Sequence, residues 1–301
     1  MQYKVSIKRK CYLLSVLLMT VWLTGCVQEE FESTPSPAGN GIRFTLTVPD
    51  VNLPSVSSRT MTGAGTAKKE DEIKTVDILV FDMSKTPAVY LECVSATGVT
   101  QDLADNSTVS FSAVLSPTTA STCIVVVANK ELDNIVSGFT KGATTKVEAM
   151  EKMLHTQTGK WLADGSTTGG YTRIPMYGEK VISKITPSMD PITGINMKRM
   201  LARIDIRNNS ATSNFTVEEV YLANYNTTGY IAPAWNTNGQ VTDPAPDTPV
   251  LPVNSGKMTE EGDAILYSVN GNTPYEGEIY TFESIAAEDV GGVGQLSLIH
   301  I

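Results

Sequence analysis

The sequence predicts an all-β protein of β-sandwich architecture with one short helix. Many short runs alternate apolar and polar residues or consist of β-branched residues, and turn signals of Gly, Pro, Asn and Ser separate them. No repeat of solenoid length and no heptad pattern is visible in the sequence. The 301 residues, 41% of them apolar and 18% charged, are enough for about two globular domains.

The first strand is expected at residues 42–48. Ile42, Phe44, Leu46 and Val48 alternate there with polar residues, which is the period of a strand with one buried face. A loop rich in Gly, Ser and Thr follows, and its composition does not favour regular structure.

More strands are expected in the next hundred residues. Ile73–Asp82 is nearly continuous in apolar residues from Val76 to Phe81, as in a strand that is buried on both faces. Further strands are predicted in "AVYLECVSA", "STVSFSAVL", "TCIVVVANK" and "IPMYGEKVISKI".

One short helix is expected after Thr145. Thr145 and Glu148 have the spacing of a capping box, and Val147, Met150 and Leu154 share one helical face. We interpret this apolar stripe as packing rather than as a cofactor site.

A break with two prolines at residues 186–194 separates these strands from a second set. The second set is expected in "NMKRMLARIDIRN", "FTVEEVYLANYN", "AILYSV" and "EIYTFES", and the proline-rich residues 232–254 are expected to form a long surface loop. We therefore predict an N-terminal β-sandwich domain at 41–194, which includes the first strand, and a second, incomplete β-sandwich at 195–295.

Residues 1–25 are predicted to be a lipoprotein signal peptide. A basic stretch precedes the apolar run Cys11–Leu23, which is too short for a typical spanning helix, and "LTGC" then resembles a bacterial lipobox. Cleavage there would leave Cys26 to carry acyl chains such as palmitate, followed by a flexible tether at 26–40. The alternative is an ordinary secretory leader that ends in a cysteine by chance.

The charge of the chain argues against nucleic acid as a partner. The 23 Lys and Arg residues face 32 Asp and Glu residues, for a formal net charge of −9, and four of the basic residues lie in the leader. Binding to phosphates needs clustered basic side chains.

Two cysteines, Cys93 and Cys123, remain after the leader and the lipid site. In an exported protein they can form a disulfide. Both lie in strand-like apolar runs, however, where a free cysteine behaves as a small buried hydrophobe. We favour free thiols, and the disulfide stays open as the alternative.

No enzymatic activity, cofactor or metal site is predicted. Zinc sites need several Cys and His residues at close spacing, and the sequence has two histidines, His155 and His300. His155 is expected to be a cation near the end of the short helix. No G-x-S-x-G motif, dinucleotide fingerprint or P-loop is present in the sequence, and its carboxylates are those of any acidic surface protein.

The last residues, 296–301, read "LSLIHI". This is the in-frame translation of CTG TCT CTT ATA CAC ATC, the opening of a transposon-end sequencing adapter. We expect that the gene sequence runs into adapter there, so that the chain is truncated and His300 is foreign to it. The alternative is a genuine apolar strand, and resequencing the locus distinguishes the two.

Several segments, in this order, resemble those of one family. They are the lipobox leader, "IRFTLTV" followed by a loop with "SRT", "VDILVFD", "CIVVVANK", "IPMYGE", "MKRMLARIDI" and "IYTFES". Together they resemble the fimbrillin family of Bacteroidota type V pilins, the FimA-type and Mfa-type major fimbrial subunit lipoproteins. The resemblance covers residues 40–290, and the order of the segments carries it. The acidic "VQEEFE" after Cys26 also resembles the surface-export signal of Bacteroidota lipoproteins.

The resemblance implies two tandem transthyretin-like Greek-key β-sandwich domains, the second incomplete here. It implies a lipid on Cys26, a location in the outer membrane exposed at the cell surface, and cleavage between Arg59 and Thr60 by an arginine-specific protease. The first strand, with Ile42, Phe44, Leu46 and Val48, would then leave, and a donor strand from the C-terminal region of the next subunit would fill the groove. This chain departs from the family because that donor region is missing, which puts its own polymerisation in doubt.

The resemblance therefore implies a structural pilin subunit of a cell-surface fimbrium that assembles by strand exchange and supports adhesion and biofilm formation. The expected partners are other pilin subunits, the outer membrane, the protease and receptors on host or bacterial surfaces. Arg59 as an ordinary solvated loop residue is the alternative to its cleavage. An anchor or tip (adhesin) subunit of the same pilus stays open, as does a lipid-anchored glycan-binding module with Trp161 and Trp235 on an exposed platform.

Overall fold

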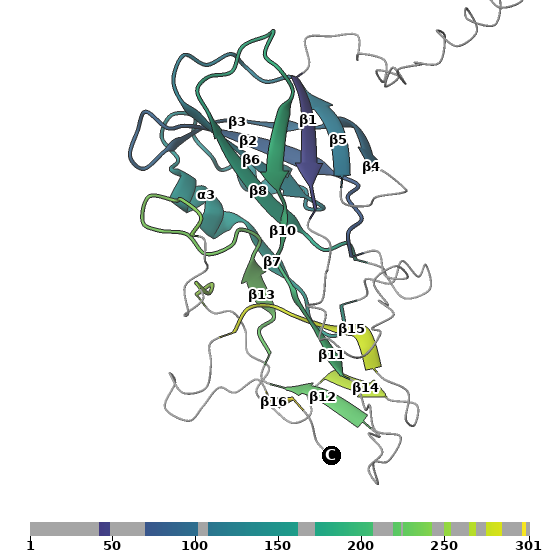
Figure 1. Ribbon diagram of the computed structural model, residues 1–301. Coiled ribbons are helices and arrows are strands. Elements are labelled where there is room, and N and C mark those ends of the chain that lie inside the picture. The colour runs from purple at the N-terminus through teal and green to yellow at the C-terminus, as the bar shows by residue number, and fades with distance from the viewer. Residues whose placement is uncertain are drawn as a thin grey trace, which may run out of the picture. The chain divides into compact units, whose positions relative to one another are not determined.

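Strands dominate the computed structural model, which confirms the all-β prediction (Figure 1). The structure describes residues 42–48, 70–101, 108–161, 172–206, 219–223, 225–242, 250–253, 265–268, 275–284 and 297–298. Residues 40–301 form one unit. The helices in the described part of the chain are too short to cross a bilayer.

The N-terminal strands are β1 (Ile42–Thr47), β2 (Val76–Asp82), β3 (Val89–Ser95), β4 (Thr97–Gln101), β5 (Thr108–Ala113), β6 (Thr122–Ala128), β7 (Leu154–Thr156), β8 (Met176–Ile182), β9 (Ile192–Asn196) and β10 (Lys198–Arg199). The later strands are β11 (Ala202–Ile206), β12 (Glu219–Ala223), β13 (Thr228–Tyr230), β14 (Ile265–Ser268), β15 (Tyr275–Thr281) and β16 (Ser297–Leu298). The helices are α2 (Asp133–Val136) and α3 (Lys146–Lys152), so the described residues hold two short helices where the sequence predicted one.

Two sheets form a β-sandwich. Sheet 1 has the strand order β4-β5-β1-β9, and sheet 2 has the order β10-β8-β6-β2-β3. The core between them takes apolar side chains from both sheets, including Phe44 and Phe111 from sheet 1 and Ile78, Val80 and Ile124 from sheet 2. The predicted β-sandwich architecture is thus present in strands that lie between residues 42 and 199.

Sheet 2 is covered on its other face as well. A second core packs Leu79, Phe81 and Val125 of this sheet against Met150 of α3 and against later residues such as Phe282. This explains why β6 is buried along its whole length and β2 along all but its last residue. The prediction that the apolar run Val76–Phe81 is buried on both faces is confirmed.

The predicted capping box at the start of α3 is confirmed. The backbone N–H and the hydroxyl of Thr145 donate to Oε2 of Glu148 at 2.7 and 2.9 Å, and the Glu148 N–H donates to the Thr145 hydroxyl at 3.2 Å. These bonds hold the pKa of Glu148 below its ordinary value. The predicted buried face is only partly right, because Met150 is buried with Lys146 and Ala149, whereas Leu154 lies beyond the helix in β7.

Both cysteines are free thiols, as we favoured. Their strands flank β2, where Cys93 of β3 lies opposite Leu79 and Cys123 of β6 lies opposite Phe81. Burial raises the pKa of the Cys93 thiol to about 12 and that of Cys123 to about 11.

The later strands form smaller sheets. β11 pairs with β15, β12 lies between β14 and β16, and β13 pairs with β7. The proline-rich stretch is less loop-like than expected, since Ala232 and Ala234 are buried and Trp235 forms a bridge with Val241 around a turn. Its residues 243–249 and 254 lie outside the described part.

Candidate functional site

The first described strand, β1, lies inside sheet 1 between β5 and β9. Figure 1 shows it beside β5. It runs antiparallel to β5, with a regular register from Ile42 opposite Ala113 to Thr47 opposite Thr108. It runs parallel to β9, and the Met197 N–H donates to the Thr47 carbonyl at 2.8 Å. β1 is therefore hydrogen-bonded on both edges.

The apolar side chains of this strand fill the core. Ile42, Phe44, Leu46 and Val48 are between 0% and 4% exposed, and Arg43 is exposed. This confirms the alternation predicted for the strand. The ring of Phe44 stacks on that of Phe111 in β5, with centroids 5.0 Å apart and an angle of 9° between the rings.

The position of β1 defines the surface that its departure would expose. Sheet 1 would divide between β5 and β9, and both would present unpaired backbone N–H and C=O groups. Apolar residues of both neighbouring strands lie opposite β1 and belong to the same core: Val109, Phe111, Ala113, Ile192 and Ile195. The result would be an apolar groove with a hydrogen-bonding edge on each side, which is a site for an extended segment.

Residues 1–41 and 49–69 lie outside the described part of the chain. The predicted lipid site Cys26 and the predicted cleavage site at Arg59 and Thr60 therefore have no described position, and both stay predictions. The described chain ends after β1 at Val48 and begins again at Glu70, and both of these residues are buried.

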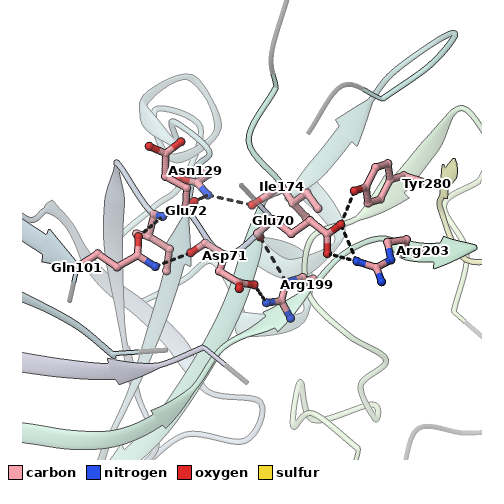
Figure 2. Close-up of polar contacts among 10 residues, drawn as sticks. Glu70, Asp71, Glu72, Gln101, Asn129, Ile174, Arg199, Arg203 and Tyr280 are labelled. Carbon is pink, nitrogen blue, oxygen red and sulfur yellow. Dashed lines mark hydrogen bonds and ion pairs between the residues drawn. The ribbon is translucent and has the colours of Figure 1, made fainter. Parts of the chain in front are cut away.

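An acidic segment begins there, and sequence reasoning missed it. The carboxylate of Glu70, a residue only 3% exposed, accepts from Nη1 of Arg203 at 2.9 and 3.0 Å and from the Tyr280 hydroxyl at 2.5 Å (Figure 2). Asp71 pairs with Arg199, and Glu72 pairs with Nε of Arg173 at 2.9 Å. The only sequence signal was opposite charge, in "EDE" at 70–72 and in "MKRMLARIDI" more than a hundred residues later.

A group of aromatic side chains surrounds His155, which lies in β7 and not at the end of a helix. Its ring is 4.9 Å from Trp161 and 6.5 Å from Phe282, measured between centroids. Burial, and then the nearby charge of Lys130, lower the pKa of His155 to about 4. Our expectation of a helix-terminus cation was therefore wrong, because His155 lies in β7 and its partly buried surroundings disfavour the charged imidazolium.

We expect His155 to make the fold sensitive to acid. The folded pKa of about 4 lies below the ordinary 6.5, so protons bind more readily to the unfolded chain. The free energy of unfolding is therefore highest above pH 6.5 and decreases as the pH falls from 6.5 towards 4. His155→Leu should reduce the slope of unfolding free energy against pH in that window. The reduction should correspond to at most about one proton bound per molecule on unfolding. Urea unfolding at several pH values measures this, and parallel plots for the two proteins would contradict it.

The aromatic platform expected of a glycan-binding module is not formed at Trp161. Trp161 is 3% exposed, and its indole N–H donates to the Thr172 carbonyl at 2.9 Å. Trp235 is half-buried and meets Tyr230 edge-on, at 76° and 4.9 Å between centroids. Within the described ranges, no cluster of His, Cys, Asp and Glu side chains could hold a metal ion.

Comparison with solved structures gives distant matches. A fimbrial assembly protein from Parabacteroides distasonis ATCC 8503 is 14% identical, with a TM-score of 0.37, and the match covers 79% of this chain and 85% of that one. A candidate cell adhesion protein from the same organism is 16% identical, with a TM-score of 0.46, and the match covers 83% of this chain and 73% of that one. Candidate polysaccharide binding proteins from Bacteroides thetaiotaomicron VPI-5482 are represented by a structure 13% identical, with a TM-score of 0.34 and coverage of 67% and 62%.

Comparison with curated proteins gives no match. The model of one protein family, described as fimbrillin-A associated anchor proteins Mfa1 and Mfa2, matches residues 32–290. That match spans β1, both sheets of the sandwich and the strands up to β15. The resemblance found in the sequence is confirmed, and this chain belongs to the family of fimbrillin-A associated anchor proteins Mfa1 and Mfa2.

Proposed function

We propose that this chain is a non-enzymatic subunit of a cell-surface fimbrium that joins a neighbouring subunit by strand exchange at β1. The observation that carries the proposal is the place of β1. It comes first among the described elements, and yet it lies in the middle of sheet 1 with all of its apolar side chains buried. A strand at one end of a chain can leave without rethreading the rest, and its departure would open the groove between β5 and β9.

The energetics favour an exchange that is triggered by a cut. Each buried side chain such as Phe44 or Leu46 contributes roughly 1.5–3 kcal/mol, and an incoming strand with the same pattern recovers this together with the backbone hydrogen bonds. While β1 is joined to the body of the protein, it competes at an effective concentration on the order of millimolar. Cleavage between Arg59 and Thr60 would remove that advantage, because β1 could then diffuse away.

The subunit would lie at the cell surface, attached to the outer membrane. A lipid on Cys26 would hold the exported chain on the outer membrane, since each buried CH₂ of an acyl chain contributes about 0.8 kcal/mol. The assembled fimbrium would support adhesion and biofilm formation through surface receptors. The family to which the chain belongs, whose members are associated with fimbrillin, supports this location.

The anchor position in the fimbrium is the second candidate, and the family description favours it. An anchor would keep its lipid on Cys26 and remain at the membrane, whereas a shaft subunit would lose residues before Thr60 when it is processed. The mass of the mature protein from the cell surface separates the two. A lipid-modified chain that begins at Cys26 indicates an anchor, and an unmodified chain that begins at Thr60 indicates a shaft subunit.

Limited cleavage tests the exchange. Treatment of the full-length gene product with an arginine-specific protease should cut at Arg59 and give a ladder of oligomers on a denaturing gel run without boiling. Arg59→Ala should abolish both the cut and the ladder and leave a folded monomer. Arg43→Ala is the matched control: it removes an exposed arginine of β1 and should leave the cut at Arg59 unchanged. A cut without a ladder, or no cut at all, would refute assembly by this route.

A further inference from the structure

The acidic segment after β1 joins distant parts of the chain. Glu70 contacts Arg203 of β11 and Tyr280 of β15, and its carbonyl accepts from Nε of Arg199 at 3.4 Å. Figure 2 shows both Arg203 and Tyr280 pointing at the one carboxylate. The side chain of Glu70 thus holds two strands that each lie more than a hundred residues away from it in sequence.

The same segment is fixed on its other side to the sandwich. Gln101, at the end of β4, donates from Nε2 to the Asp71 carbonyl at 2.7 Å and accepts from the Ile73 N–H at 3.2 Å. Asn129, just after β6, donates to the Glu72 carbonyl at 2.7 Å and accepts from the Lys74 N–H at 3.0 Å. The segment therefore has bonds to sheet 1 through β4, to the end of a sheet 2 strand, and to β11 and β15.

Burial makes the Glu70 contacts strong. A carboxylate withdrawn from water needs hydrogen-bond donors, and bonds from a guanidinium to a carboxylate are about twice as strong as neutral ones. The side chain of Glu70 is 4% exposed and that of Arg203 is 10% exposed, so water replaces neither partner easily. If Glu70 loses its charge, Arg203 and Tyr280 lose the group that orients them together.

We propose that Glu70 is a positioning residue that fastens β11 and β15 to the sandwich, and that it keeps them fastened when β1 leaves. The second half rests on the proposed strand exchange. Glu70 lies on the C-terminal side of the Arg59–Thr60 bond, so a cut there separates β1 from the body but leaves Glu70 on the retained part. The two sides of the cleavage site then have different roles: β1 is held by apolar burial and can exchange, whereas residues 70–74 are held by charges and side-chain amides and stay.

Hydrogen exchange of the intact full-length chain tests the first half. Glu70→Gln should raise amide exchange in β11 and β15 by about tenfold or more while leaving β1 and β5 within about twofold of the wild type. Tyr280→Phe, which deletes one oxygen, should change the same strands in the same direction but less. If Glu70→Gln does not fold, the Tyr280→Phe variant still tests whether the contacts of Glu70 protect β11 and β15.

The matched control is Glu92→Gln. Glu92 also accepts two hydrogen bonds, from the N–H and hydroxyl of Ser116 at 2.7 and 2.6 Å, but it lies in β3 of the sandwich. It should leave β11 and β15 unchanged. Exchange that rises evenly over the whole molecule in Glu70→Gln, or that stays unchanged in β11 and β15, would overturn the proposal.

Exchange after cleavage tests the second half. In wild-type protein cut at Arg59, the amides of β1 should exchange faster while those of β11 and β15 keep their protection. In the Glu70→Gln variant cut at Arg59, the amides of β1 and those of β11 and β15 should all lose protection from exchange. If the protease does not cut at Arg59, the strand-exchange mechanism fails, and the measurements on the intact chain still decide the role of Glu70. If cutting wild-type protein abolishes the protection of β11 and β15, the retained role of Glu70 is refuted even if β1 exchanges.

Discussion

Phe44→Ala should destabilise the folded chain by about 3–5 kcal/mol, the usual cost of deleting a buried aromatic ring. Phe44 is 1% exposed in the middle of sheet 1, and its ring stacks on Phe111 at 5.0 Å. The cavity has little chance to collapse, because β1 is hydrogen-bonded to β5 on one edge and to β9 on the other. Urea unfolding followed by circular dichroism measures the loss.

The same strand offers the control. Arg43→Ala removes an exposed side chain next to Phe44 and should change the stability by no more than about 0.5 kcal/mol. Phe44→Leu keeps much of the apolar volume and should cost less than Phe44→Ala. If Phe44→Ala and Arg43→Ala change the stability equally, β1 does not fill the core of the intact protein, and its departure would open no apolar groove.

Glu179→Leu should cost about 3–5 kcal/mol, because it leaves a buried lysine without its counter-charge. Nζ of Lys146 donates to Oε2 of Glu179 at 2.6 Å, and the Tyr177 hydroxyl donates to the same oxygen at 2.5 Å. The side chain of Lys146 is 3% exposed, whereas that of Glu179 is 21% exposed. Burial, and then the charge of Glu179, raise the pKa of Tyr177 well above its ordinary value, so this hydroxyl stays a donor.

Removing Lys146 should reduce the free energy of unfolding less than removing Glu179. Lys146→Met keeps the apolar stem and leaves Glu179 with water and with Tyr177, so we expect a loss of about 1–2 kcal/mol. The double variant should be closer to Lys146→Met than to Glu179→Leu, since no unpaired charge remains. Lys74→Ala, in a pair with Glu72 where the lysine side chain is 60% exposed, is the surface control and should cost less than about 1 kcal/mol. Equal losses for the two single variants would show that burial of Lys146 does not set the cost.

The sequence pattern predicted the structure well where buried side chains recur at every second residue of a strand or run continuously along it. The alternation in β1 and the nearly continuous apolar run of β2 predicted both the strands and the faces that they bury, and the strand β6 was predicted as well. The capping box of α3 was equally visible, because its bonds join residues three apart in sequence. The four-residue helix α2 was missed, since it is too short to show a helical period.

β9 shows why the pattern failed elsewhere. Its buried residues, Ile192 and Ile195, are three apart, and they lie opposite Phe44 and Leu46, which are two apart. A bulge takes up the extra residue, and Gly194, with a φ of +70°, supplies the backbone conformation that side chains disfavour. The sequence predicted a break at 186–194, and the proposed domain boundary at residues 194 and 195 lies inside this strand.

The sequence by itself determined the family, the all-β class, the strands with a regular period and the side chains of β1 that fill the core, because these depend on neighbours along the chain. The tertiary structure decided that β1 is a central strand between β5 and β9, that His155 is a half-buried side chain beside Trp161 and Phe282, and that Glu70 meets Arg203 and Tyr280. These features depend on parallel pairing, burial and ion pairs between segments more than a hundred residues apart, and no local period records which distant residue a strand or a carboxylate will meet.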